Sequence, residues 1–167
     1  MMDEEIYRLS ERLGTLLKQS GRVLATAESC TGGWISQAVT MVPGSSNWFD
    51  CGFVTYTNRS KEELLGVRAG TLESHGAVSE MTVREMAQGV LQRTHADYSV
   101  AVSGVAGPEG GSADKPVGTV WLAVCARDSA AQATRLQLSG DRNAVRRQAV
   151  IAALQALIRL AGTPRIT

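Results

Sequence analysis

Apolar side chains recur every three or four positions in three long stretches of the chain, and this spacing predicts helices. The first stretch covers residues 6–17; acidic residues 3–5 suit its positive N-terminal end, and Gly21 ends it. The second follows Ser79, which can cap it, and the third follows Asp141. Shorter helical patterns lie at 34–42 and from Ser60 to Gly66. Ser60 and Glu63 have the spacing of a capping box.

Short runs of apolar, β-branched and aromatic residues predict five strands, at 23–27, 53–56, 98–102, 117–125 and 134–138. Strands and helices alternate along the first part of the chain, as they do around parallel strands. The last two strands follow one another around residues 127–129, as in an antiparallel pair. We therefore expect a single α/β domain over residues 1–167, with three layers, α/β/α, and a mixed sheet.

The composition is that of a globular protein without a strongly charged partner. Seventeen Lys and Arg against 16 Asp and Glu leave a net charge of +1, which gives no basis for a nucleic-acid or anionic-membrane surface. No apolar run approaches the roughly 18 residues of a membrane span, and the acidic N-terminus is unlike a secretory signal. Cys30, Cys51 and Cys125 are widely spaced, and His75 and His95 are isolated, so neither a disulfide scaffold nor a structural zinc site is expected. We expect a cytoplasmic protein that does not span a membrane and holds no metal.

A serine stands where the strand at 23–27 turns into the helix at 34–42. Backbone N–H groups are unpaired at a helix N-terminus, so Ser29 would have donors for an oxyanion beside it. The alternative, commoner on spacing alone, is that Ser29 or Thr31 only caps the following helix. Cys30 is a competing nucleophile, but a lone cysteine without a spacing-linked histidine is more often a small buried side chain.

Lys61 falls in the first turn of the short helix that ends at Gly66, where the helix dipole opposes a positive charge. If this lysine is also partly buried, its pKa is lowered and the neutral amine becomes available as a base for Ser29. The alternative is an ordinary surface lysine at a poorly capped helix end.

Two further segments have the composition of ligand-binding sites. Residues 103–111 hold four glycines and permit close backbone approach to a ligand, although an ordinary loop is equally common with this composition. The segment lacks the Gly-Lys-Ser/Thr ending of a phosphate loop. Three arginines in the first two turns of the last helix oppose its dipole, and Arg142, the nearest to its N-terminus, is our candidate clamp for a phosphate or carboxylate. For Arg146 and Arg147 we favour surface pairs with acidic neighbours.

Together these segments resemble the CinA C-terminal domain family (competence/damage-inducible protein A). The matching motifs occur in the family's order from about residue 6 to about residue 161: TAESCTGGWIS, GSSNWFDCGFVTYTNRSK, GAVSE, SGVAGPEGG, KPVGTVW and SGDRNAVRRQA. The resemblance implies a nicotinamide-nucleotide amidohydrolase, which converts nicotinamide mononucleotide and water into nicotinate mononucleotide and ammonia. Longer members of the family carry an N-terminal pyrophosphatase domain. We find no counterpart of that domain in this sequence and expect that activity to be absent.

The resemblance also assigns roles to residues. It implies that Ser29 is the nucleophile, Lys61 the base, and Tyr56 a catalytic partner that relays or orients the proton. We expect backbone N–H groups of the turn after Ser29 to hold the oxyanion and Arg142 to bind the 5′-phosphate. The expected substrate-binding residues are Cys30, Thr31, Gly32, Gly33, Ser103, Gly104, Gly107 and Arg142. This chemistry requires neither a metal nor a redox cofactor.

A second hypothesis is a non-catalytic nucleotide-binding or regulatory module on the same fold, since a fold can outlast an activity. The joint presence of Ser29, Tyr56 and Lys61 argues against it, because a binding module does not need that combination. Apolar residues near Trp34 or Trp48 could support a homodimer.

Overall fold

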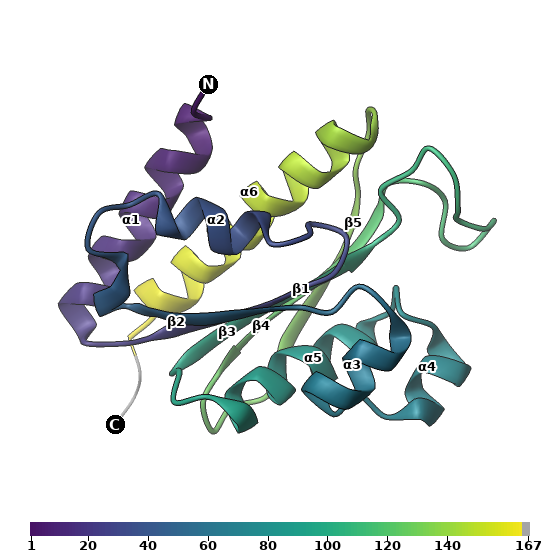
Figure 1. Cartoon of the computed structure of the whole chain (residues 1–167), viewed down its shortest axis with the longest axis horizontal. Helices are drawn as coiled ribbons and strands as arrows, with labels where there is room; N and C mark the ends of the chain where they lie inside the picture. The colour runs from purple at the N-terminus through teal and green to yellow at the C-terminus, as the bar shows by residue number, and fades with distance from the viewer. Residues whose placement is uncertain (165–167) are drawn as a thin grey trace.

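The computed structural model describes residues 1–164, in which six α-helices surround one five-stranded sheet (Figure 1). The strand order is β2-β1-β3-β4-β5. The strands are β1 (Leu24–Glu28), β2 (Phe49–Val54), β3 (Tyr98–Gly104), β4 (Thr119–Ala126) and β5 (Gln132–Gln137). β1 runs parallel to β2 and β3, whereas β4 is antiparallel to both β3 and β5, so the sheet is mixed, as predicted.

Helices cover both faces of the sheet, which confirms the three-layer α/β/α architecture (Figure 1). One layer consists of α1 (Glu4–Ser20), α2 (Trp34–Thr40) and α6 (Arg142–Gly162). The other consists of α3 (Asn58–Leu65), α4 (Ala69–His75) and α5 (Glu80–Arg93). Because side chains alternate along a strand, Val100 and Val102 of β3 join the core beneath α1 and α6, whereas Ala101 joins the core beneath α5.

Side chains cap the three long helices, at Ser79 and Asp141 as predicted and also at Asp3, which was expected only to suit the helix dipole. Asp3 accepts a hydrogen bond from the backbone N–H of Ile6, Ser79 from that of Thr82, and Asp141 from that of Ala144. Gly21 ends α1 in the left-handed region, with φ of 63°.

Two elements near the site differ from the prediction. The second strand runs over Phe49–Val54 rather than 53–56, because it pairs with β1 from Phe49 onward. As an edge strand it exposes every second residue, and Asp50 and Gly52 within it weaken the apolar signal. The short helix is capped by Thr57 rather than Ser60: Thr57 Oγ1 accepts from the N–H of Ser60, and Ser60 Oγ accepts from the N–H of Thr57.

The predicted elements also leave out α4. This short helix has no side-chain cap at its N-terminus and buries only Thr71 and Leu72, so neither a capping signal nor an apolar stripe marks it in the sequence.

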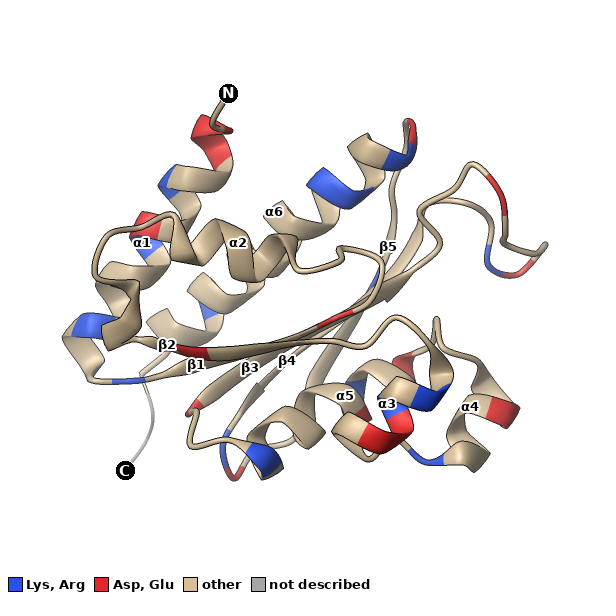
Figure 2. Ribbon diagram, in the orientation of Figure 1, with Lys and Arg blue, Asp and Glu red and all other residues tan. Residues whose placement is uncertain are grey.

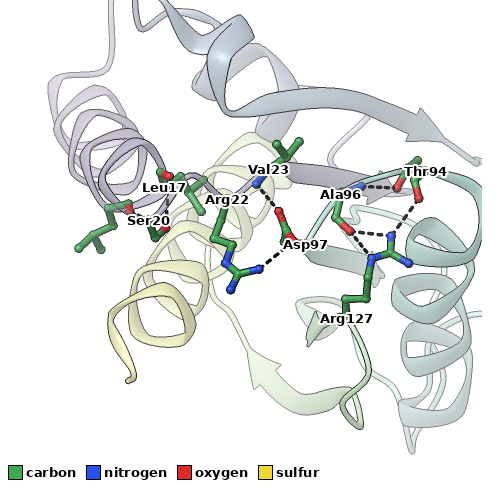
Figure 3. Close-up of polar contacts among 9 residues, drawn as sticks. Leu17, Ser20, Arg22, Val23, Thr94, Ala96, Asp97 and Arg127 are labelled. Atoms are coloured by element: carbon green, nitrogen blue, oxygen red, sulfur yellow. Dashed lines mark hydrogen bonds and ion pairs between the residues drawn. The ribbon is translucent and has the colours of Figure 1, made fainter. Parts of the chain in front are cut away.

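A set of polar contacts joins the chain at the end of the sheet where β1 and β3 begin (Figure 3). The Asp97 carboxylate accepts from the Arg22 guanidinium at 3.1 Å and from the backbone N–H of Val23 at 2.9 Å. Arg127, just after β4, donates to the carbonyl oxygens of Thr94 and Ala96. These contacts fix where both strands start, and Ser29 lies at the opposite end of β1.

Trp34 and Trp48, near which a homodimer surface was suggested, differ in exposure. Trp48 is 3% exposed and packs in the core, where a Cβ at Gly14 of α1 would lie 2.6 Å from its ring, so its own side chain offers little surface to a partner. Trp34 is half-buried beneath Arg146. Across residues 1–164, we find no helix of the length and hydropathy that crossing a membrane requires.

Candidate active site

Ser29 and Lys61 meet at the carboxyl end of β1. Ser29 follows the strand directly, and Lys61 reaches it from the first turn of α3, with 3.0 Å between Nζ and Ser29 Oγ. Lys61 Nζ also donates to the carbonyl oxygen of Thr55 at 2.8 Å. The structure thus brings together the two residues expected to form the nucleophile and its base.

The Lys61 amine is removed from water almost completely. Its side chain is 1% exposed, Ser29 is 8% exposed, and within residues 1–164 no carboxylate forms an ion pair with Lys61. Burial therefore lowers the pKa of Lys61 from its ordinary value of 10.5, an effect that Cys30 opposes only where its thiol is ionised. A lysine in this environment holds its proton weakly, as a general base must.

Neither Ser29 nor Thr31 caps α2, so the alternative reading of this turn is wrong. The N-cap position belongs to Gly33, which has no side chain to offer. Gly32 and Gly33 have φ values of 60° and 99°, a backbone conformation that glycine adopts without a steric penalty. The turn can therefore leave the strand sharply and place Ser29 beside the start of the helix.

Glu28 supplies the missing cap, and our sequence reasoning did not find it. Its carboxylate is fully buried; Oε1 accepts from Thr31 Oγ1 at 2.7 Å and from the N–H of Ile35 at 2.8 Å. Oε2 accepts from the N–H of Ser36 at 3.0 Å and from Ser36 Oγ at 2.8 Å. An acidic residue that ends an apolar strand a few residues before a helix is the signal, because the helix N-terminus favours a carboxylate.

The turn after Ser29 also presents unpaired backbone donors. The N–H of Gly32 donates to the carbonyl oxygen of Ser29 at 3.0 Å, but those of Cys30 and Thr31 have no acceptor among residues 1–164. The Cys30 side chain is buried, and burial raises the pKa of its thiol to about 11. Cys30 is thus a neutral thiol near pH 7, which favours its interpretation as a small buried side chain.

Arg142 contacts two of the other expected site residues, Gly107 and Tyr56. Its guanidinium donates to the carbonyl oxygen of Gly107 at 2.8 Å and to Tyr56 Oη at 2.8 Å. Among the described residues, the Tyr56 hydroxyl contacts this arginine and neither Ser29 nor Lys61, and the Tyr56 side chain is 57% exposed. Tyr56 therefore stands at the rim rather than in the Ser29–Lys61 pair.

The glycine-rich loop starts beside Ser29. Ser103 and Gly104 close β3, the strand next to β1, and the N–H of Ser29 donates to the carbonyl oxygen of Val102 at 3.0 Å. From there the loop reaches Gly107, which Arg142 holds from the start of α6. Basic segments gather at this end of α6 (Figure 2).

The two arginines that follow in α6 differ from each other. Arg147 pairs with Asp3 and Glu5, as expected for a surface arginine. Arg146 does not pair with an acidic neighbour, and that expectation is wrong. Its Nε donates to the carbonyl oxygen of Cys30 at 3.0 Å and its Nη2 to that of Thr31 at 3.2 Å. Its guanidinium lies 5.5 Å from the centre of a Trp34 ring.

The sequence of this chain is similar to those of known proteins. The family model described as CinA C-terminal domain matches residues 6–161. Nicotinamide-nucleotide amidohydrolase PncC of Escherichia coli (strain K12) is 54% identical over 157 residues, which cover 94% of this chain and 95% of that protein. The protein of the same name from Pseudomonas putida is 51% identical over 157 residues, 94% of this chain and 98% of that one.

A solved structure shares the fold. The crystal structure of competence/damage inducible protein CihA from Agrobacterium tumefaciens superposes with a TM-score of 0.93 at 45% sequence identity. The match covers 96% of this chain and 98% of that one.

Proposed function

Because the chain belongs to the CinA C-terminal domain family, we propose that it hydrolyses nicotinamide mononucleotide to nicotinate mononucleotide and ammonia. Relatives that match nearly all of this chain carry the name of that activity. The observation that carries the proposal is the contact of a serine with a buried lysine that forms no ion pair within residues 1–164: Lys61 Nζ lies 3.0 Å from Ser29 Oγ. Such a pair has the parts of an activated nucleophile, whereas a binding module has no use for it.

The first half of the reaction forms an ester on the serine. Ser29 Oγ attacks the carboxamide carbon of the substrate while the neutral Lys61 amine takes the hydroxyl proton. The resulting ammonium, still held by the Thr55 carbonyl oxygen, gives that proton to the departing nitrogen. The carbon–nitrogen bond breaks, ammonia leaves, and a nicotinoyl ester remains on Ser29.

The second half returns the enzyme to its starting state. Water attacks the ester carbon as Lys61 takes one of its protons, and Lys61 then returns a proton to Ser29 Oγ as the ester bond breaks. Nicotinate mononucleotide leaves, so one water is consumed and one ammonia is released for each substrate. These steps use only Ser29, Lys61 and water, and the proposal therefore invokes no metal or redox cofactor.

Charge develops on the amide oxygen in both halves, and the turn after Ser29 offers donors for it. The backbone N–H groups of Cys30 and Thr31, which have no acceptor within residues 1–164, are our candidates for the oxyanion hole. The Gly32–Gly33 turn completes this part of the site because it allows the backbone to approach a ligand closely.

The nucleotide portion requires an anion site at the rim. Arg142 stands there with Tyr56 and Gly107, next to the loop that begins at Ser103 and Gly104. We place the 5′-phosphate against the Arg142 guanidinium, which suits a phosphate better than a neutral donor. We place Tyr56 in substrate binding, because Arg142 and not Lys61 holds its hydroxyl.

The test is ammonia release from nicotinamide mononucleotide by the purified protein without added metal, together with chromatography of the product. We expect one ammonia and one nicotinate mononucleotide for each substrate consumed. Ser29→Ala should lose about three or more powers of ten in kcat while its thermal unfolding stays close to wild type, since the nucleophile is removed and no cap is lost. Binding of the nucleotide without turnover by the wild type would indicate a binding module instead.

A further inference from the structure

Arg146 of α6 contacts the backbone of the turn that follows Ser29 (residues 29–33). It lies in the second turn of α6, half-buried between the Trp34 ring and the segment after Ser29. Two of its nitrogens donate to two successive carbonyl oxygens, those of Cys30 and Thr31. No acidic side chain within residues 1–164 pairs with it, so its contacts beyond the Trp34 ring are directed at these two peptide groups.

Each of these two carbonyl groups is connected to an unpaired backbone N–H. One connection is a single peptide group, and the other consists of two peptide groups joined by a hydrogen bond. The Cys30 carbonyl shares its peptide group with the N–H of Thr31, which has no acceptor among the described residues. The Thr31 carbonyl shares its peptide group with the N–H of Gly32, which donates to the Ser29 carbonyl at 3.0 Å. That carbonyl in turn shares its peptide group with the unpaired N–H of Cys30. Two chains of peptide groups therefore start at one guanidinium and end at the two candidate oxyanion donors.

A hydrogen bond to the carbonyl of a peptide group polarises that group and strengthens its N–H as a donor, and the effect accumulates along a chain. The positive charge of the guanidinium makes each of the first bonds a charge-assisted one. The same two bonds also fix the plane of each peptide group, and thus the direction of each N–H. Orientation and polarity are the two properties that an oxyanion hole requires.

We propose that Arg146 is a positioning residue that orients and polarises the oxyanion donors beside Ser29 without touching the substrate. The proposal rests on the amidohydrolase function above. It assigns Arg146 a task different from that of Arg142, which stands at the rim with Tyr56 and Gly107. Arg146 should therefore affect the stabilisation of the transition state, whereas Arg142 should affect binding of the nucleotide.

The experiment compares Arg146→Met with Arg147→Met, a matched control one position along the same helix. Methionine retains an apolar stem against Trp34 and removes the hydrogen bonds; at position 147 it removes only the pairs with Asp3 and Glu5. We expect kcat for nicotinamide mononucleotide to fall about tenfold to 100-fold in Arg146→Met, less than the loss of an entire oxyanion donor, with KM within about threefold of wild type. Arg147→Met should keep the wild-type kcat and KM.

Two further variants separate positioning from a purely structural role. Arg146→Lys keeps the charge but has a single ammonium for two carbonyl oxygens, so its kcat should lie between those of wild type and Arg146→Met. Arg146→Ala should regain kcat when ethylguanidinium is added below denaturing concentrations, whereas a general loss of packing would not be restored by it. Thermal unfolding of each variant identifies any that fails to fold, and Arg146→Lys then decides.

Three results would overturn the inference. A rise in KM with unchanged kcat in Arg146→Met would mean that the arginine binds the substrate directly. Wild-type kcat in both Arg146→Met and Arg146→Lys would mean that its contacts do not matter to the reaction. An equal loss in Arg147→Met would mean that general disruption of α6 is responsible. Absence of turnover in the wild type would instead count against the proposed function.

Discussion

Glu28→Gln tests how the turn after Ser29 is held, and the structure allows the cost of this substitution to be worked out. Each oxygen of the buried carboxylate receives one backbone N–H, from Ile35 on Oε1 and from Ser36 on Oε2. Glutamine has almost the same shape, but one of its two terminal groups is an NH₂ that donates and cannot accept. The Thr31 and Ser36 hydroxyls can turn to accept from this group. A backbone N–H cannot, so either Ile35 or Ser36 loses its acceptor.

A buried donor left without a partner costs about 1–3 kcal/mol, and hydrogen bonds to a charged acceptor are worth more than those to a neutral one. We therefore expect the free energy of unfolding to fall by about 2–4 kcal/mol, which corresponds to a drop in Tm of roughly 4–16 °C for a chain of this size. The same segment positions Ser29, so kcat should fall by about tenfold or more as the turn loosens.

Urea unfolding followed by tryptophan fluorescence measures the first effect, and ammonia release measures the second. Glu73→Gln is the control, because Glu73 is exposed on α4 and the same change there should stay within about 0.5 kcal/mol of wild type. If Glu28→Gln matched this control in both stability and kcat, the turn would not depend on two acceptor oxygens, and our account of Glu28 would be refuted.

Four other predictions concern three residues of the site. Cys30→Ala should keep most of the wild-type kcat, because burial raises the pKa of that thiol to about 11; a loss like that of Ser29→Ala would make Cys30 the nucleophile. Arg142→Ala should reduce kcat/KM more for nicotinamide mononucleotide than for nicotinamide riboside, which lacks the phosphate. Expressed as free energy of transition-state stabilisation, the two losses should differ by about 1.5–3 kcal/mol, and equal losses would place the phosphate elsewhere. The lowered pKa of Lys61 predicts that kcat/KM rises with pH through an apparent pKa below 10.5 and that Lys61→Arg is nearly inactive, because guanidinium cannot act as a base. Between that lowered pKa and 10.5, Lys61 binds more protons in the unfolded chain than in the folded chain, so it adds a rise with pH to the free energy of unfolding; urea titrations should show this contribution as a steeper rise in the wild type than in Lys61→Met.

The sequence predicted best those features that are encoded within a few neighbouring residues. Asp3, Ser79 and Asp141 cap their helices by bonds to a residue three positions on, so pattern and cap coincide. The layer architecture followed from the alternation of elements. The site pair, Ser29 and Lys61, was proposed by joining a turn and a helix start that lie 32 residues apart, and the structure brings them into contact.

Features that depend on distant partners were missed or misplaced. The bounds of β2 are set by its pairing with β1, from Leu24 against Phe49 to Glu28 against Val54, and its own sequence alternates too weakly to show them. Arg146 resembles Arg147 in the sequence, yet one contacts carbonyl groups 115 and 116 residues away and the other contacts α1 and its cap. Only the packing of α6 against the sheet separates the two.

Glu28 is an intermediate case. All four of its contacts lie within eight residues along the chain, so the information is local. It was overlooked because the cap comes from the preceding strand, five residues before the helix N-cap, rather than from the N-cap itself. Helices that follow a buried strand directly can be capped in this way.

The placement of Arg146 on the last helix has a consequence for synthesis of the enzyme. During translation, Ser29, Lys61 and the glycine-rich loop all emerge before α6. Arg146 of α6 donates two of the hydrogen bonds that hold the turn after Ser29. In a nascent chain whose α6 has not yet packed, Ser29 and Lys61 are present but the Arg146 guanidinium does not contact the turn after Ser29. We therefore expect hydrolysis to reach its full rate only after α6 has packed, so that the full catalytic rate reports completion of the fold.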